Sequence, residues 1–409
     1  MVYLRKICNT ISVALIVIFV FGSVAITSAA AKDHDPVEAI RLTAGNPVAD
    51  AQFGRSVAMA GDLVAVGEGG DGAFGAVYLF RRQGMKYVPG ATLVSPDTAP
   101  DTYPEFGRTV AIQGNTVFVG ARFAQDGDLE RAGAVYVFEK HGSAWKFEDK
   151  IVSPAPEDED NFGRAVAVEG SRMVVTARKS SLEEGAAYVF EKKGGKWVHK
   201  ADLVAGDAAP GAYFGQSVDM QGDLIVIGAR NAGPNEAGAV YFFRKSRDGW
   251  SEIAKVIPED GKKNDQFGFA VDISGNVVAV GARRADPDSR TDAGAVYVYS
   301  VKKKSVDFVT RLSPADASAK DEFGQSVAIA GDTIAVGAWK DDNRLGSIYL
   351  FRRKGGEWNE TGRISASDGV AGDEFGYSLA AFGNKMVTGA HFADAKAGAA
   401  YVLTVKQSH

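Results

Sequence analysis

Seven copies of one pattern, spaced 52 to 56 residues apart, run through this chain of 409 residues. Each copy opens on Phe-Gly and continues with a short apolar stretch, a Gly-Asp-like turn, a Val-Gly-Ala-like run and a Gly-Ala-Val-Tyr-like segment. A period near fifty residues that is kept along a chain indicates an array of one supersecondary unit. The copies begin at Phe53, Phe106, Phe162, Phe214, Phe267, Phe323 and Phe375.

One repeat is expected to fold as four short antiparallel strands, which we name A to D in chain order. In the sixth repeat we predict strands over residues 325–329, 333–337, 347–351 and 358–364. The two residues between strands A and B have the composition of a hairpin turn with positive φ. These turns are Gly61-Asp62, Gly114-Asn115, Gly170-Ser171, Gly222-Asp223, Gly275-Asn276, Gly331-Asp332 and Gly383-Asn384.

The repeats predict an all-β fold, a seven-bladed β-propeller of four-stranded antiparallel blades with strand A innermost. Strands B and C are nearly all apolar, as in Leu63–Val66, which fits blades buried on both faces. No helical period of about ten residues appears, which argues against a parallel βαβ sheet. The seventh repeat ends after strand C, whereas Ala39–Thr43 resembles the strand D segments of other repeats. We therefore expect the N-terminal strand to pair with the last blade and close the ring.

The N-terminal residues 1–31 have the pattern of a secretory signal peptide, followed by the propeller domain at 32–409. Two basic residues precede an apolar run over 11–26, and small residues from Ser28 to Ala31 follow. The alternative is an uncleaved membrane anchor, because the run is long for a signal peptide. We expect an exported protein that is periplasmic, secreted or at the cell surface.

Cysteine content excludes one class of protein, and the charge balance argues against another. The only cysteine, Cys8, lies in the predicted signal peptide, so we expect no disulfide scaffold and stability from burial alone. The 46 Lys and Arg residues are outnumbered by 51 Asp and Glu residues, giving a net charge of −5. This balance argues against a nucleic-acid partner.

The Phe-Gly at strand A, the Gly-Ala after strand B and the Gly-Ala-Val-Tyr at strand C resemble the FG-GAP repeat. This repeat builds the N-terminal propeller of integrin α-subunits and occurs in many bacterial exported proteins. The resemblance covers about residues 37–405, nearly the whole chain after the predicted signal peptide. It implies a seven-bladed propeller that usually binds proteins or glycans and occasionally carries an enzyme site.

The connection between strands A and B departs from the integrin type, in which this connection often holds an Asp-rich calcium loop. In all seven repeats it is a two-residue turn, too short for the roughly 6 to 8 oxygen ligands that calcium takes. We therefore expect no calcium at this position and no other cofactor or metal. Two acidic loops elsewhere are interpreted as solvated loops rather than weak calcium sites. They contain Asp126, Asp128 and Glu130, and Asp286, Asp288 and Asp292.

The longer and more variable connections, B–C and D–A, must emerge together on one side of the ring, which we call the loop face. Loops on a rigid scaffold commonly carry binding residues, so we expect ligands on this face. The D–A loops are mostly acidic, whereas the C–D turns on the opposite side, which we call the turn face, are mostly basic, as at Lys302–Lys304. The disc is therefore expected to be electrically polarised. The alternative is that these charges only keep the turns soluble.

The residue after strand B is arginine in four consecutive repeats, and these arginines are expected to form an arc around the channel mouth. Arginine forks in an arc could hold a carboxylate or sulfate group. Pairing of each arginine with an acid of the neighbouring D–A loop is the alternative, which stays open. The candidate ligand residues are Arg122, Arg178, Arg230, Arg283, Trp339 and His391, with Glu68 interpreted as the corresponding residue of the first repeat.

No catalytic constellation is recognisable in the sequence. The five histidines are scattered, and there is no Ser-His-Asp spacing, zinc-ligand cluster or phosphate loop. We predict a non-enzymatic binding or adhesion module that recognises an extracellular or envelope protein or a polysaccharide. One alternative is a polysaccharide-active lyase or glycosidase, which paired carboxylates in a pocket beside Arg122, Arg178 or Trp339 would favour. The other is a structural subunit of a cell-surface assembly, whose basic turn face would bind anionic envelope in a salt-sensitive way.

Overall fold

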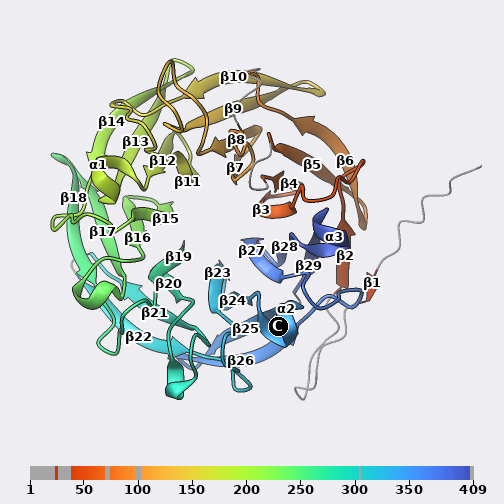
Figure 1. The fold of residues 1–409 in the computed structure, drawn as a ribbon, viewed down its shortest axis with the longest axis vertical. Helices are drawn as coiled ribbons and strands as arrows, with labels where there is room; N and C mark the ends of the chain where they lie inside the picture. The colour runs from red at the N-terminus through yellow and green to blue at the C-terminus, as the bar shows by residue number, and fades with distance from the viewer. Residues whose placement is uncertain (1–23, 26–37, 70–73, 98–102, 304, 406–409) are drawn as a thin grey trace, which may run out of the picture.

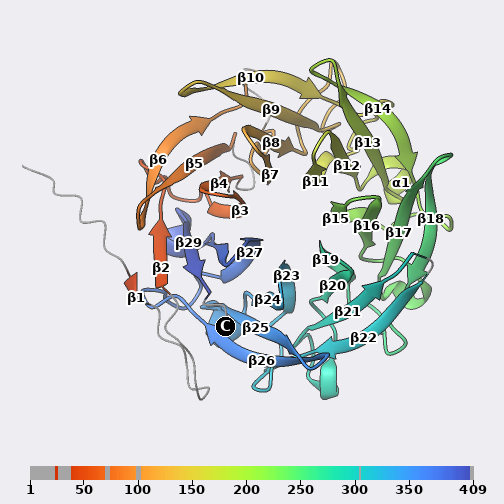
Figure 2. The ribbon, with the colours of Figure 1, turned by 180° about the vertical axis from the view of Figure 1, so that it is seen from behind.

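The computed structural model describes residues 24–25, 38–69, 74–97, 103–303 and 305–405. Over these residues the chain forms a closed ring of seven blades (Figure 1), which Figure 2 shows from behind. Each blade is an antiparallel sheet, and in the first six blades neighbouring strands follow one another in the chain. The predicted all-β, seven-bladed propeller is confirmed.

The four strand positions, A to D, recur in every blade. The A strands are β3 (Phe53–Ala60), β7 (Thr109–Gln113), β11 (Phe162–Glu169), β15 (Phe214–Gln221), β19 (Phe267–Ser274), β23 (Phe323–Ala330) and β27 (Phe375–Phe382). The B strands are β4 (Leu63–Glu68), β8 (Thr116–Ala121), β12 (Arg172–Ala177), β16 (Leu224–Ala229), β20 (Val277–Ala282), β24 (Thr333–Ala338) and β28 (Lys385–Ala390). The C strands are β5 (Ala76–Gln83), β9 (Ala134–His141), β13 (Ala186–Lys193), β17 (Ala239–Ser246), β21 (Ala295–Val301), β25 (Ser347–Lys354) and β29 (Ala399–Thr404). The D strands are β6 (Lys86–Leu93), β10 (Ala144–Ile151), β14 (Lys196–Leu203), β18 (Gly249–Val256), β22 (Val306–Leu312), β26 (Glu357–Ile364) and, in the last blade, β2 (Glu38–Leu42).

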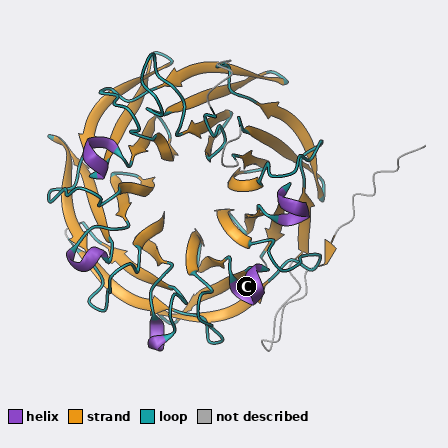
Figure 3. Cartoon of the chain, viewed as in Figure 1, coloured by secondary structure: helices purple, strands orange, loops and turns teal. Residues whose placement is uncertain are grey.

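The helical segments are single turns in the B–C loops (Figure 3). Several of their residues are left-handed, such as Ser181 and Leu182 with φ of 50° and 60°. These segments are therefore tight loop turns, and they leave the sheet architecture unchanged. They are α1 (Ser180–Glu183), η1 (Pro234–Glu236), η2 (Pro287–Ser289), α2 (Asp341–Arg344) and α3 (Ala393–Lys396).

The ring is closed by β2, which pairs with β29 as the outer strand of the last blade. Ala39 and Leu42 of this strand are buried, and Leu42 packs in the same apolar cluster as Val402 of β29. The predicted closure by the N-terminal strand is confirmed. A further two-residue strand, β1 (Val24–Ala25), pairs with the free edge of β2. Apart from β1, the predicted signal peptide lies outside the described residues.

The Phe-Gly pairs join each blade to the one before it. At the seam between the last and first blades, the Phe53 amide donates a hydrogen bond to the Ala397 carbonyl, with 3.0 Å between N and O. The Phe53 side chain is fully buried. Gly54 has φ of +93°, and a Cβ there would lie 2.3 Å from the Ala399 carbonyl oxygen. The motif is therefore a packing device, in which glycine permits the close approach of two blades.

The same inter-blade hydrogen bond occurs at the other six seams. Its donors and acceptors are Phe106 and Phe74, Phe162 and Ala132, Phe214 and Glu184, Phe267 and Ala237, Phe323 and Ala293, and Phe375 and Leu345.

Candidate functional site

The residue after each Phe-Gly lines the central channel at its loop-face end. The channel holds a cavity of about 270 Å³ that is bordered by the inner strands of all seven blades. We call the seven residues the channel ring: Arg55, Arg108, Arg164, Gln216, Phe269, Gln325 and Tyr377. Two residues further along each strand lies a tier of apolar side chains: Val57, Val110, Val166, Val218, Val271, Val327 and Leu379.

A local break in strand pairing places the channel ring. In the first blade Phe53 pairs with Glu68, but the next pair is Ser56 with Gly67, so two residues of the inner strand have no opposite partner. The same break follows Phe162, and it works as a β-bulge that turns the chain. Phenylalanine therefore enters the blade while the following residues face the channel. The sequence analysis missed this ring, although Phe-Gly-Arg in the first three repeats was a visible signal.

Two members of the predicted arginine arc pair with neighbouring polar side chains. Arg122 donates to both carboxylate oxygens of Glu105, at 2.7 and 3.1 Å. Arg283 donates to the amide oxygens of Gln266 and Gln325 at 2.8 and 2.9 Å, and it lies 3.5 Å from Glu322. Both side chains are largely buried, with 12% and 14% exposed. At these two positions the acid-pairing alternative describes the structure.

The other two arginines of the arc have no carboxylate ion pair among the described residues. Arg178 donates to the amide oxygen of Gln216 at 3.1 Å, and its guanidinium lies 5.4 Å from the Tyr213 ring centre. Arg230 lies over the same ring at 4.7 Å. The Nε atoms of Arg178, Arg230 and the channel-ring residue Arg164 are buried and have no hydrogen-bond partner within the described part of the chain. These two arc residues and Arg164 therefore present positive charge and hydrogen-bond donors without partners.

Trp339 and His391 follow their B strands at the predicted height, but both are used inside the fold. Trp339 donates its indole N–H to Glu322 at 2.9 Å, and His391 Nε2 lies 3.3 Å from Glu374. His391 is 1% exposed, and its ring lies 3.9 Å from the ring of Tyr377. Burial and neighbouring arginines hold the His391 pKa well below its usual value, so this ring is neutral at pH 7. The buried imidazole therefore packs against the ring of Tyr377.

Glu68 does not belong to the set of residues that follow strand B, which corrects the sequence interpretation. It pairs with Phe53 just as Ala177 pairs with Phe162, so it takes the place of the alanine that ends strand B. Gly69 is therefore the first blade's counterpart of the arginines. Glu68 instead hydrogen-bonds to Tyr78, and burial raises its pKa.

Positive charge is concentrated over the first four blades. Burial and the nearby guanidinium groups of Arg178, Arg108 and Arg122 lower the pKa of Arg164 well below its usual value. The pKa of Arg178 falls to about 10, through burial and its neighbours Arg230 and Arg122. Burial alone would raise the pKa of Tyr377, but Arg108 and Arg55 outweigh it and lower the pKa. A bound anion would relieve this repulsion, so the cluster is suited to an oxyanion.

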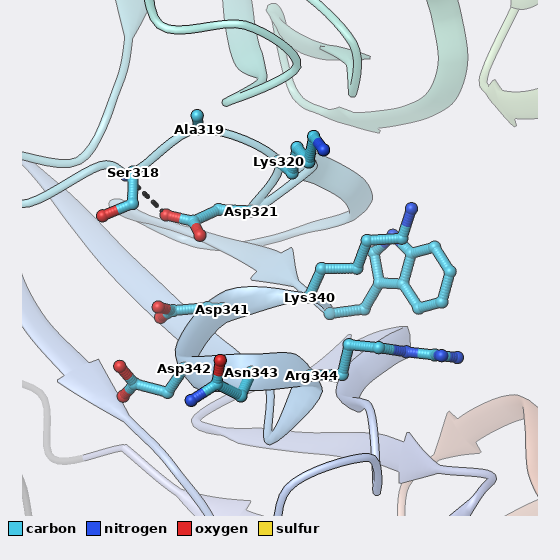
Figure 4. A pocket seen from close by; sticks show the side chains of 10 residues that line it. Ser318, Ala319, Lys320, Asp321, Lys340, Asp341, Asp342, Asn343 and Arg344 are labelled. Carbon is cyan, nitrogen blue, oxygen red and sulfur yellow. Dashed lines mark hydrogen bonds between the residues drawn. The ribbon is translucent and has the colours of Figure 1, made fainter.

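A second cavity, of about 700 Å³, lies on the sixth blade beside the channel mouth (Figure 4). Asp321 and Asp341 line it together with Trp339, so it carries carboxylates where the enzyme alternative requires them. Both have other partners: Asp321 accepts from the Ser318 amide at 2.6 Å, and Asp341 accepts from the Tyr349 hydroxyl at 2.9 Å. Burial raises the pKa of Asp321 to about 6 and also raises that of Asp341.

Asp321 has counterparts in other blades, which indicates that its role is structural. Asp160, Asp265 and Asp373 accept the corresponding backbone hydrogen bonds in their own D–A loops, at 2.8 to 2.9 Å. Burial raises the pKa of Asp160 and of Asp265 to about 6 as well. The shared environment therefore reflects a repeated loop cap.

Further along the inner strands toward the turn face, β15 and β19 carry an acidic pair. Asp219 accepts from the amides of Met220 and Ile273, each at 2.8 Å, and Asp272 accepts from the Ile329 amide at 2.7 Å. Burial raises the pKa of Asp219 to about 6, and burial together with Asp219 raises that of Asp272 well above its usual value. Both carboxyl groups therefore keep their protons to a higher pH than an exposed aspartate does.

Within the described residues, His, Cys, Asp and Glu side chains form no group of three or more that could hold a metal ion. In the acidic loop of the fifth blade, Asp286 accepts from the Asp292 amide at 2.8 Å, and Asp288 lies 3.4 Å from Arg290. In the same described part of the chain, no helix has the length and apolarity needed to cross a membrane.

Comparison with known protein families gives seven matches to one model, the FG-GAP repeat. The matched residues are 36–80, 90–138, 145–190, 197–243, 250–299, 306–351 and 358–403. Together they cover most of the chain, and each match ends within or next to strand C of a blade. No curated protein matches the chain.

Proposed function

The chain belongs to the FG-GAP repeat family, and on this premise we propose that it is an exported, non-enzymatic binding module. Its loop face recognises an anionic group of an extracellular or envelope protein or of a polysaccharide. The observation that carries this proposal is the group of arginines over the third and fourth blades. Arg164, Arg178 and Arg230 each bury an Nε donor without a partner and have no carboxylate ion pair among the described residues.

Such an arrangement lowers the stability of the free protein. A buried donor without a partner costs about 1–3 kcal/mol, and like charges brought together add repulsion. Functional sites often retain unfavourable features of this kind, because the ligand supplies the missing acceptors and charge. The neighbouring Arg122 and Arg283 are hydrogen-bonded within the fold, so an arginine at this position does not have to keep unpaired donors.

The proposal is tested by screening the purified protein against a glycan array and an envelope extract, followed by paired substitutions. Arg178→Ala with Arg230→Ala is expected to weaken binding of the captured ligand at least tenfold, since each arginine offers charge-assisted donors. The matched control is Arg82→Ala with Arg247→Ala, which removes the same charge from exposed positions on the turn face. Loss of binding in the control pair alone would transfer the site to the basic turn face and refute the proposal.

Export is part of the same proposal and has its own test. The protein is expected to leave the cytoplasm and to lose residues 1–31, because the leader has the charge and apolar pattern of a signal peptide. N-terminal sequencing of the protein recovered from cell fractions decides the point. An intact leader in the membrane fraction would favour the anchor instead.

A polysaccharide-active enzyme is the second candidate, and the cavity on the sixth blade favours it. Asp321 there is a carboxyl group with a pKa of about 6 beside Trp339, a combination found in general acids of glycosidases. Its counterparts in three other blades favour the structural role described above. Incubation of the protein with the polysaccharides that it binds distinguishes the two. Product formation that Asp321→Asn abolishes would establish the enzyme.

A further inference from the structure

The channel ring combines three kinds of group around one small cavity. Arginines follow Phe-Gly in the first three blades, carboxamides do so in the fourth and sixth, and aromatic rings do so in the fifth and seventh. Arginine forks bind carboxylates, amides bind hydroxyl groups, and aromatic rings pack against apolar faces. A uronic acid presents all three surfaces on one ring: a carboxylate, hydroxyl groups and a C–H face.

We propose that this cavity binds the terminal uronic-acid residue of an anionic polysaccharide, with the sugar carboxylate on Arg55, Arg108 and Arg164. This inference rests on the proposed function, and it adds the ligand class and a set of residues below the arginine arc. These three arginines belong to consecutive blades, so their side chains border one side of the cavity.

The arginine side has room for one more acceptor. The Arg164 Nε is buried without a partner, and its main charged neighbours are other guanidinium groups and the Tyr377 hydroxyl. Two carboxylates lie near these arginines: Glu105, which accepts two hydrogen bonds from Arg122 and has Arg108 at 3.6 Å, and Glu374, whose charge interacts with Arg55. Guanidinium groups still outnumber carboxylates beside Arg164, so a bound anion is electrostatically favoured.

The remaining ring members favour a sugar over an acidic peptide side chain. The Gln216 and Gln325 amide oxygens accept from Arg178 and Arg283 at 3.1 and 2.9 Å. These bonds fix both carboxamides and leave their NH₂ groups as the donors that remain for ligand hydroxyl groups. Phe269 and Tyr377 also line the cavity, with Arg283 over the Phe269 ring at 3.9 Å and His391 packed against the Tyr377 ring. An Asp or Glu side chain would use the arginines and leave these groups without a counterpart.

The size and floor of the cavity limit the ligand to a chain end. Its volume of about 270 Å³ lies below the range of roughly 300–1,000 Å³ that is typical of sites for whole drug-sized ligands. The apolar tier of valines and one leucine lies below the ring. A charged chain would lose its hydration in passing this tier, so threading through the channel is disfavoured. The ligand therefore enters from the loop face and stops with one residue in the channel.

The test is calorimetric titration of the purified protein with a galacturonic acid trisaccharide. Its controls are the carboxyl-reduced neutral trisaccharide and a tri-glutamate peptide. Arg164→Gln, and separately Arg55→Gln, are each expected to weaken trisaccharide binding at least tenfold, while Arg247→Gln on the turn face leaves it unchanged. Binding should also fall as salt is raised, because the contact is ionic.

Melting temperatures separate a binding role from a structural one. Arg164→Gln removes a charge that its neighbours repel, so its melting temperature is expected to stay level or rise while binding is lost. A lower melting temperature together with unchanged affinity would overturn the inference, as would equal binding of the neutral sugar.

The remaining outcomes distinguish this inference from the proposed function. Stronger binding of tri-glutamate would identify a peptide ligand, which overturns the sugar assignment and leaves the anion-binding function in place. Trisaccharide binding that is lost in the Arg178 and Arg230 double variant but kept in Arg164→Gln would place the ligand on the arc instead of in the channel. If neither the parent protein nor any variant binds the trisaccharide, and the screen captures no ligand, both this inference and the proposed function are refuted.

Discussion

Closure of the ring by β2 can be tested with one leucine and a matched partner. Leu42 is 3% exposed and pairs with Ala400 of β29. Leu203 ends strand D of the third blade, is 2% exposed and pairs with Ala187, so it occupies the corresponding position in a blade made from contiguous sequence. Truncation of a buried leucine to alanine costs about 2–5 kcal/mol. If β2 is a full member of the last blade, Leu42→Ala and Leu203→Ala should cost about the same.

The expected change is large enough to measure by thermal unfolding. An entropy of unfolding of about 2.1 cal/mol/K per residue gives roughly 0.8 kcal/mol/K for a propeller of about 370 residues. A loss of about 3 kcal/mol therefore lowers the melting temperature by roughly 4 °C. Differential scanning calorimetry of the parent and the two variants checks this. A Leu42→Ala protein that melts with the parent, beside a destabilised Leu203→Ala protein, would show that the N-terminal strand contributes little to closure.

Three further predictions concern the acidic pair, calcium and the blade seams. The Asp219 pKa of about 6 lies above the value of roughly 3.9 for an unfolded chain, so protonation of Asp219 stabilises the fold at low pH and this contribution is lost as pH rises through about 6. Asp272→Asn removes one of two neighbouring negative charges, so it should raise the melting temperature more at pH 8 than at pH 4.5; an equal shift at both would contradict the raised pKa of Asp219. A chelator is expected to leave the melting temperature unchanged, because each A–B connection has only two residues; a drop of several degrees would reveal a bound ion. Gly54→Ala should destabilise the seam by several times the effect of Gly61→Ala, because both have positive φ but only Gly54 faces backbone within 4 Å; similar melting temperatures would count against the packing role of Phe-Gly.

The blade count, the A–B turns and the closing strand could all be predicted from the sequence, because each is repeated or complements a missing repeat. The channel ring could not be derived from strand alternation. Regular alternation puts Phe53 and Arg55 on the same face, whereas the break in pairing between Phe53 and Ser56 sends them to different sides. The error at Glu68 has a related cause. The first repeat ends strand B with Gly-Glu rather than Gly-Ala, and only the pairing of Glu68 with Phe53 shows which residue takes the alanine position.

Pairing of the arginines was left open by the sequence, and the structure shows why counting acids could not decide it. The acids of the D–A loops have several separate tasks. Asp97 binds the Tyr136 hydroxyl and the Lys150 ammonium at 2.6 and 2.7 Å, in an arrangement that other blades repeat with their own tyrosine and strand D base. Asp160 holds the backbone of its own loop at the Glu157 amide.

Among the described residues, the acids that contact the residues after strand B lie directly before Phe-Gly, and this position differs among the blades. It is glutamate in the second blade, where Glu105 pairs with Arg122, but Asn161 and Tyr213 occupy it in the third and fourth. A neutral residue there cannot balance the charge of Arg178 or Arg230. Positive charge therefore persists over these two blades of a protein whose net charge is −5 and whose loops are largely acidic. The residue before Phe-Gly, rather than the overall charge, therefore decides which arginines of the arc have a carboxylate partner.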